Sequence, residues 1–176
     1  MSHNGDVRIV PWSDGDVTVL EHSNTPEMTQ FLGGPESPEK LAERHARYLR
    51  LGASGEARMF TIHVDGIRDA VGSVGYWEAT WHESAVYESG WSIATAYQGR
   101  GFASEALVVC LAHAAEHGSR HAVVAFPRTD NAASNALCRR LGFDLSGPED
   151  GEYPPGNRIR VNAWVYDLTR LRASKQ

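Results

Sequence analysis

The sequence feature that most constrains the fold is a change of pattern near residue 95. From Phe60 to about residue 94, apolar and polar residues alternate in short segments, as in antiparallel strands with one buried face. Residues 101–116 show a long helical pattern, and residues 121–126 form the continuous apolar run of a strand buried on both faces. A strand, a helix and a buried strand in this order predict a right-handed parallel crossover.

The first half of the chain predicts an antiparallel meander with a helix inserted early. Ser37, Pro38 and Glu39 have the character of an N-cap, a first helical proline and an acidic first turn, so we expect a helix to about residue 51 with Gly52 as its stop signal. The sequence Asp65-Gly66 is a hairpin signal. The predicted strands are residues 7–10, with 17–20 as a continuation, and residues 60–64, 70–77 and 85–94.

The second half adds two helices and a final hairpin. The first helix ends at Gly118, and its apolar stripe consists of Ala103, Leu107, Cys110, Leu111 and Ala114. A second helix spans about residues 131–141 and is closed by Gly142. Residues 158–168 alternate as a strand after a turn at residues 153–156. We therefore predict one α+β domain over residues 1–176, with a mostly antiparallel twisted sheet of six to seven strands and helices on both faces.

Composition excludes several classes of protein. A chain of 176 residues can bury a core without staples, and the two cysteines are too few for a disulfide framework, which fits a reducing compartment. No stretch approaches the roughly 18 apolar residues needed to span a bilayer, and the start lacks a signal-peptide pattern, so we expect a cytoplasmic protein with no membrane partner. The net charge of −5 disfavours nucleic-acid binding and is compatible with an amine-bearing partner.

The loop Gln98-Gly99-Arg100-Gly101-Phe102-Ala103 lies between the last strand of the meander and the long helix. Its two glycines allow backbone N–H groups to converge beside a helix start, which makes a cradle for phosphate or pyrophosphate, and Arg100 adds charge. A plain glycine turn is the alternative. The nucleoside-triphosphate pattern GxxxxGK[ST] is absent. The dinucleotide pattern has Ser104 in place of its third glycine and His121 near its acidic position.

Gln98, Gly101 and Ala103 match the Q/R-x-x-G-x-G/A signature of the GNAT-type N-acetyltransferases, which binds the pyrophosphate of acetyl-coenzyme A, and the chain resembles that family. The resemblance implies acetyl-CoA as co-substrate. It also implies that the pantetheine arm lies along the backbone of the strand before the loop. The cofactor-binding residues that it implies are Trp91, Ser92, Ile93, Ala94, Gln98, Gly99, Arg100, Gly101, Phe102, Ala103, Ser104, Asn131, Ser134 and Cys138.

A second string extends the resemblance. Asn131, Ser134, Leu137 and Gly142-Phe143 are similar to the N-x-x-S-x-x-L…G-F element of the subgroup that acetylates ribosomal-protein amino termini. The resemblance covers residues 58–168 well and the N-terminal part loosely. It implies that residues 58–168 form the cofactor-binding sheet and helices, and that residues 1–57 supply the first strand and the helices on the acceptor side.

Acetyl transfer to an amine requires the amine to lose a proton, because a lysine amine has a pKa near 10.4 and an amino terminus near 8. Glu88 is our candidate base, since it lies a few residues before the loop and points away from the face that carries Tyr87, Trp91 and Ile93. Glu78 is a second carboxylate candidate. A solvated strand glutamate with no catalytic role is the alternative for Glu88.

The leaving thiolate must gain a proton. Many members of the family use a tyrosine directly after the leucine of the second helix, but here Leu137 is followed by Cys138. In the ribosomal subgroup a serine at the position of Ser134 is assigned this role. The spacing of Asn131, Ser134 and Cys138 places them on one helix face, which suits a cofactor-facing stripe. Alternatively, Asn131 only caps the helix, and a thiol of pKa about 8.5 leaves without an acid.

Other assignments are weaker. His113, Glu116 and His117 match H-x-x-E-H literally, but they lie at the end of the long helix without a clear third ligand, so we expect no metal. Cys138 as a nucleophile lacks a paired histidine. The missing tyrosine leaves a non-catalytic acyl-CoA-binding or sensing domain as the rival function.

The amine acceptor is not specified by the sequence. A protein or peptide amino terminus is slightly favoured by the subgroup resemblance, and small amines remain open. Trp77, Trp81 and Tyr153 are candidates for shaping its pocket, although aromatic residues of this kind are more often core or rim. The sequence is compatible with a homodimer and does not specify the oligomeric state.

Overall fold

The computed structural model describes residues 5–174, so the ends of the predicted 1–176 domain lie outside the described residues. The strands are β1 (Val7–Pro11), β2 (Ala57–Val64), β3 (Gly72–Trp81), β4 (Ser84–Ile93), β5 (Ala122–Ala125), β6 (Asp144–Glu152) and β7 (Arg158–Asp167). The helices are α1 (Val17–Ser23), α2 (Pro26–Thr29), α3 (Pro38–Ser54), α4 (Phe102–His117), α5 (Ala132–Arg140) and α6 (Thr169–Ala173). Two short 3-10 helices are η1 (Asp14–Asp16) and η2 (Thr95–Tyr97).

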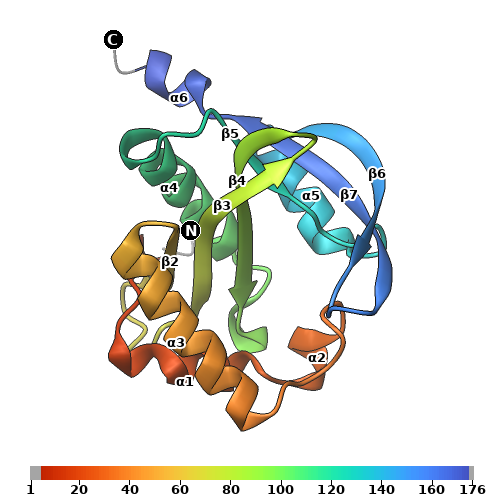
Figure 1. Ribbon diagram of the computed structural model, residues 1–176. Coiled ribbons are helices and arrows are strands. Elements are labelled where there is room, and N and C mark those ends of the chain that lie inside the picture. The colour runs from red at the N-terminus through yellow and green to blue at the C-terminus, as the bar shows by residue number, and fades with distance from the viewer. Residues whose placement is uncertain (1–4, 175–176) are drawn as a thin grey trace.

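All seven strands form one sheet in the order β1-β2-β3-β4-β5-β7-β6. Neighbouring strands pair antiparallel except β4 and β5, which are parallel and are connected through α4. The predicted α+β fold with a single parallel crossover is therefore confirmed. In Figure 1, β5 and β7 run diagonally away from the nearly vertical β3 and β4.

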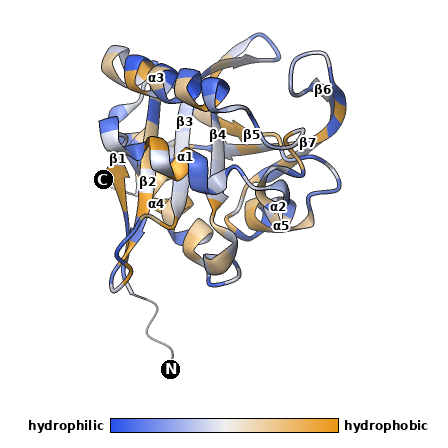
Figure 2. Ribbon diagram, turned by 90° about the horizontal axis from the view of Figure 1, so that it is seen from below, coloured by the Kyte–Doolittle hydropathy of each residue, from blue (hydrophilic) through white to orange (hydrophobic). Residues whose placement is uncertain are grey.

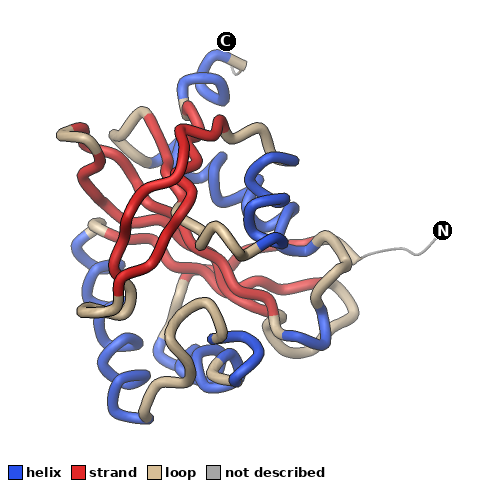
Figure 3. The backbone as a smooth tube through the Cα atoms, turned by 90° about the vertical axis from the view of Figure 1, so that its right-hand side faces the viewer, coloured by secondary structure: helices blue, strands red, loops and turns tan. Residues whose placement is uncertain are grey.

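Helices cover both faces of the sheet, as predicted (Figure 3). On one face α4 packs against β1, β3 and β4, and its buried side chains include Leu107, Cys110 and Leu111. On the other face α3 packs against β2 and α1. Figure 2 shows that α4 is mostly hydrophobic whereas α3 mixes both characters, so α3 is the helix with the larger solvent-facing side. Within residues 5–174, no helix has both the length and the apolar character required to cross a bilayer.

Two predictions about the first half are wrong. Residues 17–20 belong to helix α1 and do not continue the first strand. Pro11 ends β1, and the Asp16 carboxylate accepts a hydrogen bond from the Ser13 amide (2.7 Å), which starts a helical turn directly before α1. Gly52 lies inside α3, which continues to Ser54 and ends at Gly55, where φ is +85°. The left-handed backbone at Gly55, and not Gly52, is the C-terminal cap of this helix.

The sheet opens between its two parallel strands. Within the described residues, the β4–β5 ladder contains only the pairs Tyr87–Val123 and Glu88–Val124. β5 ends at Ala125, while β4 continues to Ile93. The backbone edge of residues 89–93 therefore faces a gap and not a neighbouring strand. This opening positions the site.

Candidate active site

The glycine loop is held against the end of β4. The Gln98 side chain donates from Nε2 to the Ile93 carbonyl (2.9 Å), and its backbone N–H donates to the Thr95 carbonyl. Gly99 and Gly101 both have positive φ, at +74° and +86°. These values lie in the left-handed region, which favours glycine over other residues. The glycine turn that the sequence predicted thus forms in the segment that connects η2 to α4.

The loop leads into a helix start that can bind an anion. Gly101 is the N-cap of α4, so the N–H groups of Phe102, Ala103 and Ser104 have no intrahelical carbonyl to bond. The helix dipole adds partial positive charge at the same place. The Arg140 guanidinium donates to Ser104 Oγ (2.7 Å) and so joins the end of α5 to this first turn. The Arg100 guanidinium lies 5.7 Å from the centre of the Tyr97 ring.

Next to the opening lies a cavity of about 890 Å³, which we call the central cavity. It brings together four of the predicted cofactor residues, Trp91 and Ser92 from β4 with Asn131 and Ser134 from the start of α5. Glu88 also lines it. Ile93 is buried in the core, and Ala94 donates its N–H to the Val71 carbonyl. Neither Ile93 nor Ala94, nor any residue of the glycine loop, is among the cavity-lining residues that the structure describes.

The start of α5 is fixed by two asparagines. Asn131 is the N-cap and accepts a hydrogen bond from the Ser134 N–H (3.2 Å), so it has the capping role that the sequence left as an alternative. Asn135, only 8% exposed, was not identified from the sequence. Its Nδ2 donates to the carbonyls of Arg128 and Asn131, and its Oδ1 accepts from Asn162 Nδ2 and Trp164 Nε1. Asn135 therefore ties the helix start, with Ser134, to β7.

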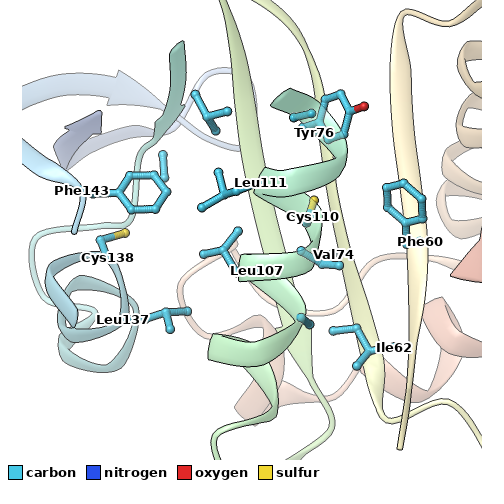
Figure 4. Packing of buried hydrophobic residues seen from close by; sticks show 14 of the residues in the cluster. Phe60, Ile62, Val74, Tyr76, Leu107, Cys110, Leu111, Leu137, Cys138 and Phe143 are labelled. Carbon is cyan, nitrogen blue, oxygen red and sulfur yellow. The ribbon is translucent and has the colours of Figure 1, made fainter. Parts of the chain in front are cut away.

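Cys138 lies in the core. Its side chain is 0% exposed, and Figure 4 shows it beside Phe143 among the residues that pack around α4. Burial raises the pKa of the Cys138 thiol to about 12, which disfavours the thiolate that a nucleophile requires. Cys138 is not among the described residues that line the central cavity, so the structure separates it from Asn131 and Ser134.

The Glu88 side chain lies on the face that carries α1 and α3, opposite to Tyr87 and Ile93, which pack in the α4 core. Desolvation by burial raises the pKa of Glu88, and a polar contact with the Trp77 side chain lowers it. General bases are commonly carboxyl groups that lie in a cavity and have a raised pKa. Glu78 also lines the cavity but lies 3.4 Å from Arg120, with which it forms an ion pair.

The outer part of the central cavity is formed by α1, α3, the loop before α3 and the turn between β6 and β7. Arg44 of α3 forms an ion pair with Glu36 and donates to the Tyr153 hydroxyl (3.3 Å), so it joins the loop to the turn. Trp77 and Tyr153, which the sequence offered as residues of an acceptor pocket, both line this cavity. Trp81 is not among its described lining residues and donates from Nε1 to the Glu149 carboxylate (3.2 Å).

The histidines at the end of α4 have structural contacts. His113 Nδ1 lies 2.9 Å from the Tyr76 hydroxyl, and its ring stacks on His117 with 4.2 Å between the ring centres. Burial lowers the pKa of His113. Among residues 5–174, no group of three or more histidine, cysteine, aspartate or glutamate side chains is arranged to hold a metal ion.

A sheet that opens between two parallel strands, beside a helix start reached through a glycine turn, is the architecture of the GNAT class. A family model described as an acetyltransferase (GNAT) domain matches residues 6–144. The chain therefore belongs to the GNAT acetyltransferase family and is an acyltransferase.

Solved structures agree with this assignment. A structure described as RimL, a ribosomal L7/L12 α-N-protein acetyltransferase, is 25% identical, with a TM-score of 0.77 over 94% of this chain and 91% of that chain. The spermidine N-acetyltransferase from Vibrio cholerae, solved with CoA and spermine, is 17% identical, with a TM-score of 0.77 over 94% and 98%. The structure of yncA from Salmonella typhimurium, solved with its cofactor acetyl-CoA, is 20% identical, with a TM-score of 0.72 over 92% and 94%. The last two show the fold alone.

Proposed function

We propose that the protein transfers an acetyl group from acetyl-CoA directly to a primary amine that is bound in the central cavity. The observation that carries this proposal is the edge of β4 that has no β5 partner. Its residues 89–92 line the central cavity together with Glu88 and Ser134, and its last residue, Ile93, is joined by Gln98 to the glycine turn before α4. The structures from Vibrio cholerae and Salmonella typhimurium contain CoA and acetyl-CoA, which supports acetyl-CoA as the co-substrate here.

The chain offers suitable groups for each part of such a molecule. The N–H groups at the start of α4 would bind the diphosphate, because they have no intrahelical acceptor and the helix dipole favours negative charge there. The backbone edge of residues 89–93, with its amides free of a β5 partner, would hold the extended pantetheine arm. The thioester supplies the activated acetyl group, and this arrangement would bring it to the cavity wall near Ser134.

Glu88 would accept the proton that the amine loses, directly or through a water, as the amine nitrogen bonds to the acetyl carbon and the carbon–sulfur bond breaks. The raised pKa of Glu88 brings the carboxylate closer to the pKa of an amine and makes it a better base. The sulfur would take a proton from Ser134 or leave as the thiolate. Cys138 is too deep in the core to substitute for the tyrosine that other family members use.

The central cavity suits a cationic acceptor. Among the described residues, its lining contains seven carboxylates, Glu36, Glu56, Glu78, Glu88, Glu149, Asp150 and Glu152, and three guanidinium groups, Arg44, Arg47 and Arg128. This excess of negative charge favours an ammonium ion over its neutral or anionic competitors. The similarity to a ribosomal-protein α-N-acetyltransferase makes a protein or peptide amino terminus the acceptor that we propose first.

The test is turnover of acetyl-CoA with peptides of free amino terminus and with small amines, followed by mass spectrometry for the acetyl shift. Glu88→Gln should lower kcat/KM at least about tenfold, since general base catalysis contributes about 100-fold or more. Glu78→Gln and Glu152→Gln are matched controls, because both carboxylates line the same cavity and each has a partner of its own. A larger loss in either control than in Glu88→Gln would overturn the assignment of the base.

Gly101→Glu tests the anion site separately. It places a carboxylate at the N-cap of α4, where the Glu105 Oε1 already lies 4.0 Å from the position of a new Cβ, and it should abolish CoA binding in calorimetry. Gly101→Ala is the control, because it carries the same backbone strain at φ +86° without the charge. If Gly101→Glu folds and binds CoA as tightly as Gly101→Ala, the diphosphate does not bind here.

A further inference from the structure

Trp77 of β3 lies directly opposite Glu88 on the neighbouring strand β4. The two residues are directly paired in the antiparallel ladder between β3 and β4, and both line the central cavity. Directly opposite side chains on one face of such a ladder have Cβ atoms about 5 Å apart, which is close enough for an indole N–H to reach a carboxylate. Trp77 is therefore a neighbour of Glu88 that the strand pairing itself fixes.

The position of the indole ring is set by a glycine. A Cβ atom built on Gly90, two residues beyond Glu88, would lie 3.1 Å from Cη2 and 3.7 Å from Cζ3 of Trp77. Gly90 is not among the residues with positive φ, so its backbone conformation does not require glycine. The missing side chain at Gly90 instead leaves the space in which the six-membered ring of Trp77 lies. The ring packs across β4, and its orientation beside Glu88 is thereby restricted.

The charged side chains around the cavity, apart from Glu88, have partners of their own. On the outer side, Arg44 pairs with Glu36, and the Arg47 guanidinium lies 6.0 Å from the centre of the Tyr48 ring. Arg128, from the loop after β5, pairs with Asp130. The remaining carboxylates have the following partners: Glu56 with Ser54, Glu78 with Arg120, Glu149 with His82, Asp150 with Arg160, and Glu152 with the Gly156 amide.

Trp77, by contrast, lies directly opposite Glu88 in the ladder and lines the same cavity. Burial of the Glu88 carboxylate raises its pKa, and the Trp77 side chain is the counteracting influence, since a hydrogen bond to the charged form lowers the pKa of a carboxyl group. Without this contact, burial would act unopposed and the pKa of Glu88 would be higher still.

We propose that Trp77 is a positioning residue for Glu88: its indole N–H holds the carboxylate in its ionised form and orientation, and its ring, seated over Gly90, fixes that contact. The proposal rests on the proposed function, in which Glu88 is the base. It assigns a role in the reaction to a tryptophan that would otherwise be classed with the packing of the acceptor pocket.

The experiment is the pH dependence of kcat/KM in Trp77→Phe, which keeps a ring over Gly90 and removes the donor. The acid limb should move up by about 0.5 to 1 pH unit, so that the rate on the limb falls about three- to tenfold while the high-pH plateau stays close to wild type. The carbon-13 signal of the Glu88 carboxyl, followed by NMR during a pH titration of the free enzyme, should move in the same direction. This second readout does not depend on turnover.

Trp81→Phe is the matched control, because Trp81 lies on the same strand and donates to Glu149 instead of Glu88. It should leave the acid limb at its wild-type pH. Gly90→Ala is a second variant, in which the new methyl group displaces the indole. It is followed by the NMR titration of the Glu88 carboxyl in the free enzyme, which should move as in Trp77→Phe. An unmoved limb and an unmoved NMR titration in Trp77→Phe would overturn the proposal, as would an equal loss of rate at every pH in that variant.

Failure of the proposed function gives a different result. If Glu88→Gln keeps both full turnover and the wild-type acid limb, Glu88 is not the base. If Glu88→Gln loses turnover and the limb while Trp77→Phe changes neither the limb nor the carboxyl titration, Glu88 is the base and only the role of Trp77 is wrong.

Discussion

Asn135 makes four hydrogen bonds from one buried amide group, and through them the start of α5 is fixed on β7. We expect Asn135→Ala to lower the free energy of unfolding by about 2–3 kcal/mol, because it leaves the buried Trp164 Nε1 without its acceptor. Urea denaturation would measure the loss. Asn162→Ala removes one partner at a less buried position and should cost about 1 kcal/mol or less. Equal stability of Asn135→Ala and the wild type would contradict this role.

At the same scale, Cys138 shows why a helix face does not define a site. Ser134 and Cys138 do share one side of α5, as their spacing predicted, but four residues correspond to about 6 Å along the axis. Ser134 is in the first turn, at the cavity wall, whereas Cys138 lies one turn deeper, against Phe143. Periodicity gives the direction of a side chain and not the depth at which the core begins. Asn135 was missed for a related reason, since its partners on β7 are distant in sequence.

Among the elements, α3 offers a direct test of where a helix ends. Gly52 lies inside the helix with open space at the position of a Cβ, so Gly52→Ala should stabilise the protein by about 0.5–1 kcal/mol. Gly55 has φ +85°, so Gly55→Ala should destabilise it by about 1 kcal/mol. Thermal or urea unfolding of the two variants would show opposite signs. A loss of stability in Gly52→Ala would indicate that the helix stops there.

The elements that the sequence predicted well are those in which buried residues recur at a regular spacing. The alternation over residues 60–64 and the stripe of α4 each face one core, and the parallel crossover followed from their order. The bounds of β6 were not predicted, because this edge strand is largely exposed, contains Gly147 and Pro148, and carries no apolar alternation. The sequence of α1 is rich in β-branched residues, so its helical state depends on the turn before it and on packing against α3.

At the scale of the whole molecule, CoA should stabilise the fold, because the proposed CoA-binding site joins residues of β4, α4 and α5 that the unfolded chain does not bring together. At a free CoA concentration 100 times Kd, the gain is about 2.7 kcal/mol, which should raise Tm by several degrees for a chain of this size. A thermal melt with and without CoA would measure it. Gly101→Glu should show no shift, and a full shift in that variant would place the ligand elsewhere.

Under the proposed function, donor binding and acceptor binding fall in different parts of the chain. The opening and the helix starts beside it come from the middle of the sequence, residues 89–134, whereas the outer cavity is built from the early helices and from the β6–β7 hairpin near the other end. Substitutions in the two flanking stretches would therefore alter which amine is selected while the thioester donor is still held in the same way. If the proposed function holds, a lineage with this arrangement can acquire new acceptors without rebuilding its donor site.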